Sequence, residues 1–96
     1  MSYRVLLSSV VKKDAVENLF PFLVANLPNV RGFKGCLNVT VLFDEATRKM
    51  VFDEEWISVE AHKNYIEFIS NNGVLADLAG FIEAPPAIEY YKRVEI

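Results

Sequence analysis

The chain has only one cysteine, one histidine and one tryptophan, and this scarcity limits its chemistry. Cys36 has no partner for an internal disulfide, and there is no C-x-x-C pair of the kind that binds zinc or exchanges disulfides. A phosphate-binding glycine loop and a nucleophile triad are also missing. We therefore expect no metal site and no cofactor, and we expect the reducing cytoplasm as the location.

Neither a basic cluster nor a long apolar run is present. The 10 Lys and Arg residues are outnumbered by 13 Asp and Glu residues, so the net charge is −3 and binding to nucleic-acid phosphates is not expected. No stretch reaches the ~18–20 apolar residues of a membrane span, and the N-terminal apolar run is too short for a signal peptide. We expect a soluble protein with neither a nucleic-acid nor a membrane partner.

The spacing of apolar residues predicts strands and helices within one domain, residues 1–96. The first helix is expected to begin before Pro21, with a kink there, rather than nearer Asn18 with Pro21 in its first turn, and to end at Pro28. Ser58 is expected to cap the second helix, whose apolar stripe includes Ala61, Tyr65 and Phe68. The expected strands are 3–10, 36–43, 50–57 and 87–96; the expected helices are 16–27 and 59–70, with a short helical turn at 74–79.

The order βαββαβ predicts a ferredoxin-like α+β fold. Each βαβ crossover is right-handed, so both helices lie on one face of a four-stranded antiparallel sheet and the other face is bare. The apolar fraction of 52% is above the usual ~45–50%. Apolar side chains also occupy both sides of the middle strands: Leu37, Val39, Val41, Phe43, Met50, Phe52 and Trp56 on one, and Cys36, Leu42, Val51 and Ile57 on the other.

A bare sheet face with this much apolar surface would exceed the patches usual for monomers. Covering it at about 25 cal/mol per Å² is worth many kcal/mol before the costs of association. We therefore expect a symmetric homodimer in which sheet packs on sheet.

A short motif set lies in the middle of the chain: a strand that starts Gly35-Cys36-Leu37, a hairpin, Glu54-x-Trp56, Ser58 and Ala61. In a chain of under a hundred residues this set resembles the antibiotic biosynthesis monooxygenase family of the dimeric α+β barrel superfamily. The resemblance implies a homodimer whose two sheets form a barrel, with a pocket between sheet and helices in each subunit. Some members oxidise aromatic polyketides or quinols with O2 and no metal or flavin, and others degrade haem or act on small signalling molecules.

The sequence departs from this family at two places. Many members carry a histidine nine residues after the tryptophan, where this chain has Tyr65; its only histidine, His62, comes three residues earlier. The haem-degrading branch typically has an asparagine on the first strand, where Ser8 and Ser9 stand here. Both departures argue against haem degradation, although haem binding through His62 stays a third hypothesis.

Three residues are candidate catalytic groups. Trp56 can stack on an aromatic substrate and donate a hydrogen bond, or it can simply anchor the core. Tyr65 can donate a proton or hydrogen bond to a phenolic or quinone oxygen, or pack with its hydroxyl in water. Glu54 shares a strand face with Trp56, and burial would make it a possible base; otherwise it pairs with an Arg or Lys.

Three further residues are candidate substrate-binding groups: Asn38, His62 and Phe52. Asn38 can orient a substrate carbonyl or serve the pocket edge structurally. His62 can act near neutral pH, although a lone histidine beside Lys63 on a helix is more often exposed. Tyr90 and Tyr91 point to opposite faces of the last strand, so at most one of them can reach a given pocket.

These residues favour a cofactor-independent monooxygenase that acts on a small aromatic, polyketide or quinone-like molecule. The pocket would remove a phenolic proton, hold the anion with Trp56, Tyr65 and Asn38, and exclude water while the ring reacts with O2. Whether the chain is an enzyme is left open. The alternative is a non-catalytic module of the same fold that binds a small apolar ligand or serves dimerisation.

Overall fold

The computed structural model describes all residues from 1 to 96, and its elements follow the expected order. The strands are β1 (Tyr3–Val10), β2 (Cys36–Asp44), β3 (Lys49–Trp56) and β4 (Ala87–Lys92). The helices are α1 (Val16–Arg31), α2 (Val59–Asn71) and α3 (Val74–Ala79). No helix is both long enough and apolar enough to cross a membrane.

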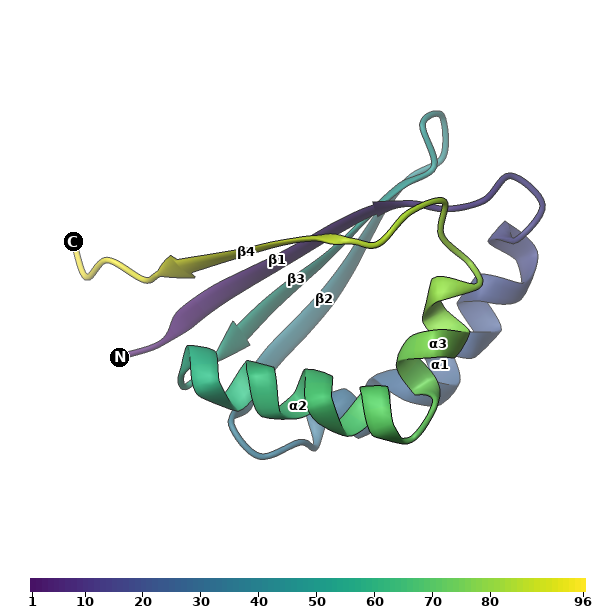
Figure 1. Cartoon of the computed structure of the whole chain (residues 1–96). Coiled ribbons are helices and arrows are strands. Elements are labelled where there is room, and N and C mark those ends of the chain that lie inside the picture. The colour runs from purple at the N-terminus through teal and green to yellow at the C-terminus, as the bar shows by residue number, and fades with distance from the viewer.

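The four strands form one antiparallel sheet in the order β2-β3-β1-β4. All three helices lie on the same face of this sheet, as Figure 1 shows. This arrangement confirms the ferredoxin-like α+β fold. The two strands in the middle of the sheet, β3 and β1, contribute Val5, Leu7, Met50, Phe52 and Trp56 to the buried core.

Helix α1 is longer than expected because a proline does not end it. The helix begins at Val16, before Pro21, as expected, but it continues past Pro28 to Arg31. Pro28 lacks an N–H group, yet its carbonyl still accepts a hydrogen bond from Gly32 N–H at 3.0 Å. The Arg31 side chain also donates to the Val39 carbonyl at 3.0 Å, which ties the end of the helix to β2.

A β-bulge at the start of β2 changes which side chains face the helices. Cys36 pairs with Trp56 and Asn38 pairs with Glu55, which leaves Leu37 without a partner in the register. The extra residue reverses the alternation. The expected faces of the first two residues were therefore wrong: Cys36 packs against the core, and Leu37 is 54% exposed.

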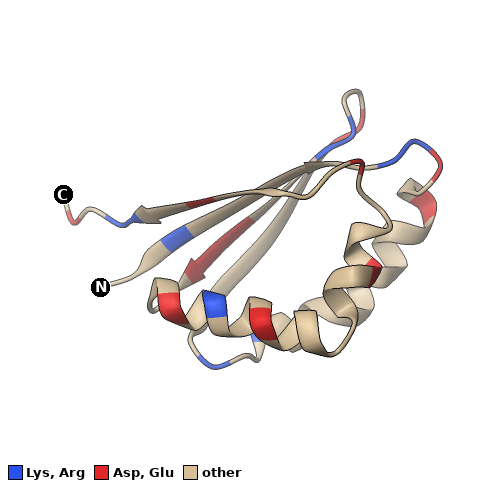
Figure 2. Ribbon diagram, in the orientation of Figure 1, with Lys and Arg blue, Asp and Glu red and all other residues tan.

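The sheet face turned away from the helices is more polar than expected. Arg4 forms an ion pair with Asp53 at 3.0 Å, and Arg93 forms one with Glu55 at 3.1 Å. Figure 2 shows the basic segment of β1 beside acidic segments of β3. Apolar side chains such as Leu42, which is half exposed and pairs with Val51, lie on the same face farther along the strands. The outer face thus carries charged as well as apolar groups, and it is not the continuous apolar surface that the sequence suggested.

Candidate functional site

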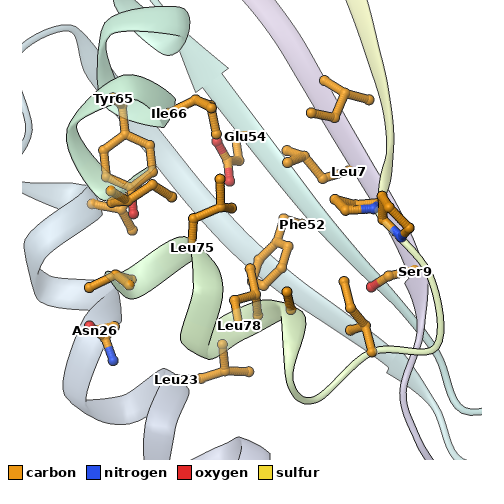
Figure 3. A pocket seen from close by; sticks show the side chains of 18 of the residues that line it. Leu7, Ser9, Leu23, Asn26, Phe52, Glu54, Tyr65, Ile66, Leu75 and Leu78 are labelled. Atoms are coloured by element: carbon orange, nitrogen blue, oxygen red, sulfur yellow. The ribbon is translucent and has the colours of Figure 1, made fainter. Parts of the chain in front are cut away.

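A cavity of about 630 Å³ lies between the sheet and the three helices. Its wall is mainly apolar, and Figure 3 shows Leu7 and Phe52 of the sheet facing Leu75 and Leu78 of α3. This volume lies within the ~300–1,000 Å³ usual for small-molecule sites. The cavity therefore has the size and lining to hold a small apolar molecule.

Polar groups lie toward both ends of the cavity wall. Glu54, His62 and Tyr65 belong to one set, and Ser9 and Lys12 belong to the other. On the sheet these sets are separated along the strands, because Glu54 pairs with Val5 whereas Ser9 pairs with Met50. The first set contains the two buried polar residues of the chain, Glu54 and His62.

The carboxyl group of Glu54 is buried at this end of the cavity. Its side chain projects from β3, and the residue is 5% exposed. Trp56 Nε1 donates a hydrogen bond to Glu54 Oε1 at 2.8 Å. Burial raises the pKa of Glu54 to about 7, although the tryptophan hydrogen bond acts in the opposite direction. Glu54 can therefore gain or lose a proton near neutral pH.

His62 is fully buried beside Glu54, so the expectation of an exposed histidine was wrong. Its Nδ1 lies 2.9 Å from the hydroxyl oxygen of Tyr90. Its Nε2 lies 3.6 Å from Glu54 Oε1 and has no hydrogen-bond partner. Burial lowers the pKa of His62 to about 4, so the imidazole is neutral at pH 7.

The position of His62 follows from how α2 is seated on the sheet. Ser58 caps the helix by accepting a hydrogen bond from Ala61 N–H at 3.0 Å, as expected. Ala61 packs against Gly35, where an added Cβ would lie 2.6 Å from Ala61 Cβ. This close approach turns His62 toward the sheet, while Phe68, expected on the buried stripe, is half exposed.

Tyr65 lies one helical turn beyond His62 and packs among aromatic rings. Its ring centroid is 5.6 Å from that of Trp56 and 5.2 Å from that of Phe33. Burial raises the pKa of Tyr65 to about 12, and the nearby Glu54 adds to this effect. Tyr65 is therefore a neutral phenol that can donate a hydrogen bond into the cavity.

The structure brings four of the six candidate residues to the cavity wall: Phe52, Glu54, His62 and Tyr65. Trp56 is fully buried behind Glu54 and does not form part of the wall. Asn38 is exposed, pairs in register with Glu55 on the outer face, and does not join this group. Asn38 alternates with the buried Val39 along β2, so its side chain faces away from the cavity.

Two residues of this region were not singled out from the sequence. Tyr90, on the edge strand β4, is the partner of His62; the alternation of Tyr90 and Tyr91 showed only that one of the two would face inward. Phe33 lies in the loop before β2 and packs against both Trp56 and Tyr65. Loop residues carry no periodicity, so no sequence signal marked it.

The arrangement is suited to moving a proton in an apolar setting. A carboxyl group with a near-neutral pKa lies beside a neutral imidazole and a phenol, at the wall of a mostly apolar cavity. No three or more His, Cys, Asp or Glu side chains are grouped so that they could hold a metal ion.

Neither a protein-family model nor a curated protein matches the sequence. Several solved structures do share the fold over nearly the whole chain. Rv0793 from Mycobacterium tuberculosis is 17% identical over 100% of this chain and 98% of that chain, with a TM-score of 0.82. A conserved protein from Methanosarcina mazei Go1 is 16% identical over 98% and 94%, with a TM-score of 0.85.

A third structure, named antibiotic biosynthesis monooxygenase, is 16% identical over 97% of this chain and 99% of that chain, with a TM-score of 0.83. Proteins from Nitrosomonas europaea and Deinococcus radiodurans carry the same name in provisional form. At these identities the likeness establishes the fold. The chain has the fold of solved proteins named antibiotic biosynthesis monooxygenases.

Proposed function

We propose that the chain is a member of the antibiotic biosynthesis monooxygenase family and a cofactor-independent monooxygenase. Its substrate would be a small aromatic, polyketide or quinone-like molecule bound between sheet and helices. The observation that carries this proposal is Glu54: a buried carboxyl group with a pKa near 7 at the wall of an apolar cavity of about 630 Å³. The shared fold with proteins of that name supports it.

In this proposal Glu54 acts as the base. It takes the proton of a phenolic or enolic hydroxyl, and the substrate anion stays in a site from which the ligand has displaced water. The Tyr65 hydroxyl donates a hydrogen bond to the anionic oxygen, and Phe52 packs against the ring. The electron-rich anion, for example that of an anthrone, then reacts with O2 at its CH2 carbon. That carbon becomes a carbonyl, the second oxygen atom leaves as water, and the substrate supplies all the electrons. Trp56 contributes by holding the Glu54 carboxylate at 2.8 Å, without contact to the substrate.

The direct test is O2 uptake by the intact chain with a panel of anthrones and hydroquinones. Glu54→Gln should lower kcat at least about 100-fold on any active compound, since general bases contribute about 10²–10⁴-fold. Glu55→Gln is the matched control, because Glu55 faces the outer side and binds Ser2 and Arg93. Absence of turnover across the panel, or equal activity of the Glu54 variant, would contradict the proposal.

The mainly apolar wall also favours a second function, a non-catalytic module that binds a small apolar ligand. In that case the same panel should raise the melting temperature without any O2 consumption. Substitution of Phe52 by Ala should weaken that stabilisation by the ligand, whereas Glu54→Gln should leave it nearly unchanged.

Haem binding through His62 is the weakest of the hypotheses. The imidazole is fully buried, and its free Nε2 faces Glu54 at 3.6 Å, which leaves no room for iron without a rearrangement of α2. A haem titration should produce no Soret shift that depends on His62→Ala.

The homodimer is likewise part of the proposal, with the outer sheet face as the interface. Leu6, Leu42 and Val51 share that face with the Arg4–Asp53 and Arg93–Glu55 ion pairs. Leu6 pairs in register with Asp53, and Leu42 pairs with Val51, which lies two residues from Asp53 along β3. Self-association would cover these apolar groups and add charge complementarity. Light scattering at micromolar concentration should give twice the chain mass; a monomer of 10.9 kDa would contradict it.

A further inference from the structure

We propose that Glu54, His62 and Tyr90 form a proton relay from the cavity to the surface at β4, in which His62 changes tautomer when Glu54 gains or loses its proton. The inference deepens the proposed function, because it rests on Glu54 as the base. It assigns a positioning role to His62 and Tyr90, neither of which needs to touch the substrate.

The geometry places one imidazole nitrogen toward each neighbour. His62 Nε2 lies 3.6 Å from Glu54 Oε1, and His62 Nδ1 lies 2.9 Å from the Tyr90 hydroxyl oxygen. His62 Nε2 is the one buried side-chain polar atom in the chain without a hydrogen-bond partner. Buried polar groups are almost always paired. A small movement that closes the 3.6 Å gap would complete a continuous hydrogen-bonded chain.

The far end of the relay reaches the surface. β4 is an edge strand, and Tyr90 is only partly buried. The ammonium group of Lys63 lies 6.0 Å from the centroid of the Tyr90 ring. A charged amine at that distance marks the side of the ring that is open to water.

The cavity itself cannot carry a proton between Glu54 and water when a ligand occupies it. Glu54 is 5% exposed, and its remaining path to water runs through the cavity. An apolar ligand would displace that water. The route through His62 and Tyr90 leads away from the cavity toward β4 and stays available while the ligand is bound.

The proton balance requires a neutral histidine throughout. When Glu54 is protonated, its O–H faces bare Nε2, and Nδ1–H donates to the Tyr90 oxygen. Three transfers release one proton: Glu54 O–H to Nε2, Nδ1–H to the Tyr90 oxygen, and the original Tyr90 proton to water. Glu54 is then a carboxylate that accepts from Nε2–H, and Tyr90 O–H donates to Nδ1. The reverse sequence returns one proton from water to Glu54.

The surroundings leave Glu54 as the only member that titrates near neutral pH. Besides burial, Asp53 on β3 raises the pKa of Glu54 and the Trp56 hydrogen bond lowers it. Glu54 in turn adds to the effect of burial in raising the pKa of Cys36 on β2, Tyr65 on α2 and Tyr90 on β4, while its β1 partner in register is apolar Val5. Burial raises the pKa of Cys36 to about 11 and that of Tyr65 to about 12. On the Tyr90 side the neighbouring basic residue is Lys63.

Side-chain 15N NMR of His62 in the free, intact chain between pH 5 and 9 tests the relay. We expect a neutral imidazole throughout, with its hydrogen on Nδ1 at low pH and on Nε2 at high pH, and a midpoint near the pKa of Glu54. A single tautomer over the whole range, or a transition to imidazolium, would overturn the proposal. A merely structural histidine would show no such change.

Three variants sharpen the test. Glu54→Gln removes the titrating group, so the tautomer should be the same at every pH. Tyr90→Phe removes the partner of Nδ1–H, so the Nε2–H form should persist at low pH. Tyr91→Phe is the matched control, because Tyr91 donates only to Glu89 and is half exposed; it should retain the change.

A Tyr90→Phe variant that changes tautomer as the wild type does would overturn the surface end of the relay. Should that variant fail to fold, Glu54→Gln alone decides whether the tautomer follows the carboxyl group. The measurement uses no substrate. Absence of O2 uptake would therefore contradict the proposed enzyme activity without contradicting the relay. A His62 tautomer that does not change with pH would contradict the relay without contradicting the enzyme activity.

Discussion

The indole of Trp56 does not line the cavity, but it acts on the charge of Glu54, which does. It is fully buried, and its N–H donates to the carboxylate that forms the cavity wall. A hydrogen bond to an ionised group contributes about 1.5–3 kcal/mol. That contribution favours the charged form of Glu54, against the larger effect of burial. Trp56 thus keeps the carboxyl group able to ionise at neutral pH.

Trp56→Phe should therefore raise the pH at which Glu54 ionises. Loss of the hydrogen bond removes stabilisation of the carboxylate, and a shift of about one pH unit corresponds to ~1.4 kcal/mol. The 13C shift of the Glu54 carboxyl group, followed through a pH titration, measures the midpoint. Phe68→Leu, at a half-exposed aromatic without contact to the carboxyl group, serves as the control. An unchanged or lower midpoint in Trp56→Phe would show that the indole does not hold the charged form.

Part of the cluster formed by Glu54, Trp56, His62 and Tyr90 was predictable from the sequence. Glu54 and Trp56 lie two apart on a strand, so their common face followed from the pleat, and the hydrogen bond between them confirms it. The burial of His62 was not predictable, because its neighbours Lys63 and Asn64 gave no apolar signal. Its partner Tyr90 is 28 residues away in sequence, and only the fold brings the two together.

At the scale of elements, one glycine decides where α2 lies on the sheet. Gly35 has φ of +93°, and a Cβ there would lie 2.6 Å from Ala61 Cβ and 3.1 Å from Ile57 Cγ1. Both neighbours belong to the junction between β3 and α2. The close approach therefore fixes the rotation of the helix that carries His62 and Tyr65.

Gly35→Ala should destabilise the chain by about 2–4 kcal/mol, from the left-handed backbone together with the steric overlap. Gly73→Ala is a matched control, since Gly73 has φ of +89° but nothing within 4 Å of an added Cβ. That control should cost only about 1–2 kcal/mol. Urea unfolding monitored by Trp56 fluorescence gives both values. Equal losses in the two variants would mean that the contact with Ala61 does not matter.

The order and type of the elements were predictable because apolar spacing is a local signal. β1 spans Tyr3–Val10 and α3 spans Val74–Ala79, as the spacing predicted. The bulge at Leu37 and the passage of α1 through Pro28 were not predictable. Each depends on a contact with another element, since Arg31 binds the Val39 carbonyl and Cys36 packs opposite Trp56. The cavity was likewise not predictable, because it forms only where the helices pack on the sheet.

At the scale of the whole molecule, two buried groups make opposite contributions to the pH dependence of stability. The pKa of Glu54 rises from 4.5 to about 7 on folding, so the native state holds more protons than the unfolded state and stability falls as pH rises through this range. The pKa of His62 falls from 6.5 to about 4, so its contribution to stability increases as pH rises from about 4 to 6.5. Each contribution amounts to about 3 kcal/mol, and the two nearly cancel.

Removing one group should expose the contribution of the other. His62→Gln leaves Glu54, so its free energy of unfolding should fall by about 3 kcal/mol between pH 4.5 and 7, relative to the wild type. Glu54→Gln leaves His62, so its free energy of unfolding should rise by a similar amount between pH 4 and 6.5. Urea unfolding at half-unit pH intervals measures both slopes, with Glu45→Gln, in the exposed turn between β2 and β3, as the surface control. If the free energy of unfolding changed with pH in the same way in the wild type and both variants, the two groups would not titrate as a buried pair. The opposite slopes expected for the two variants require that both pKa values are shifted.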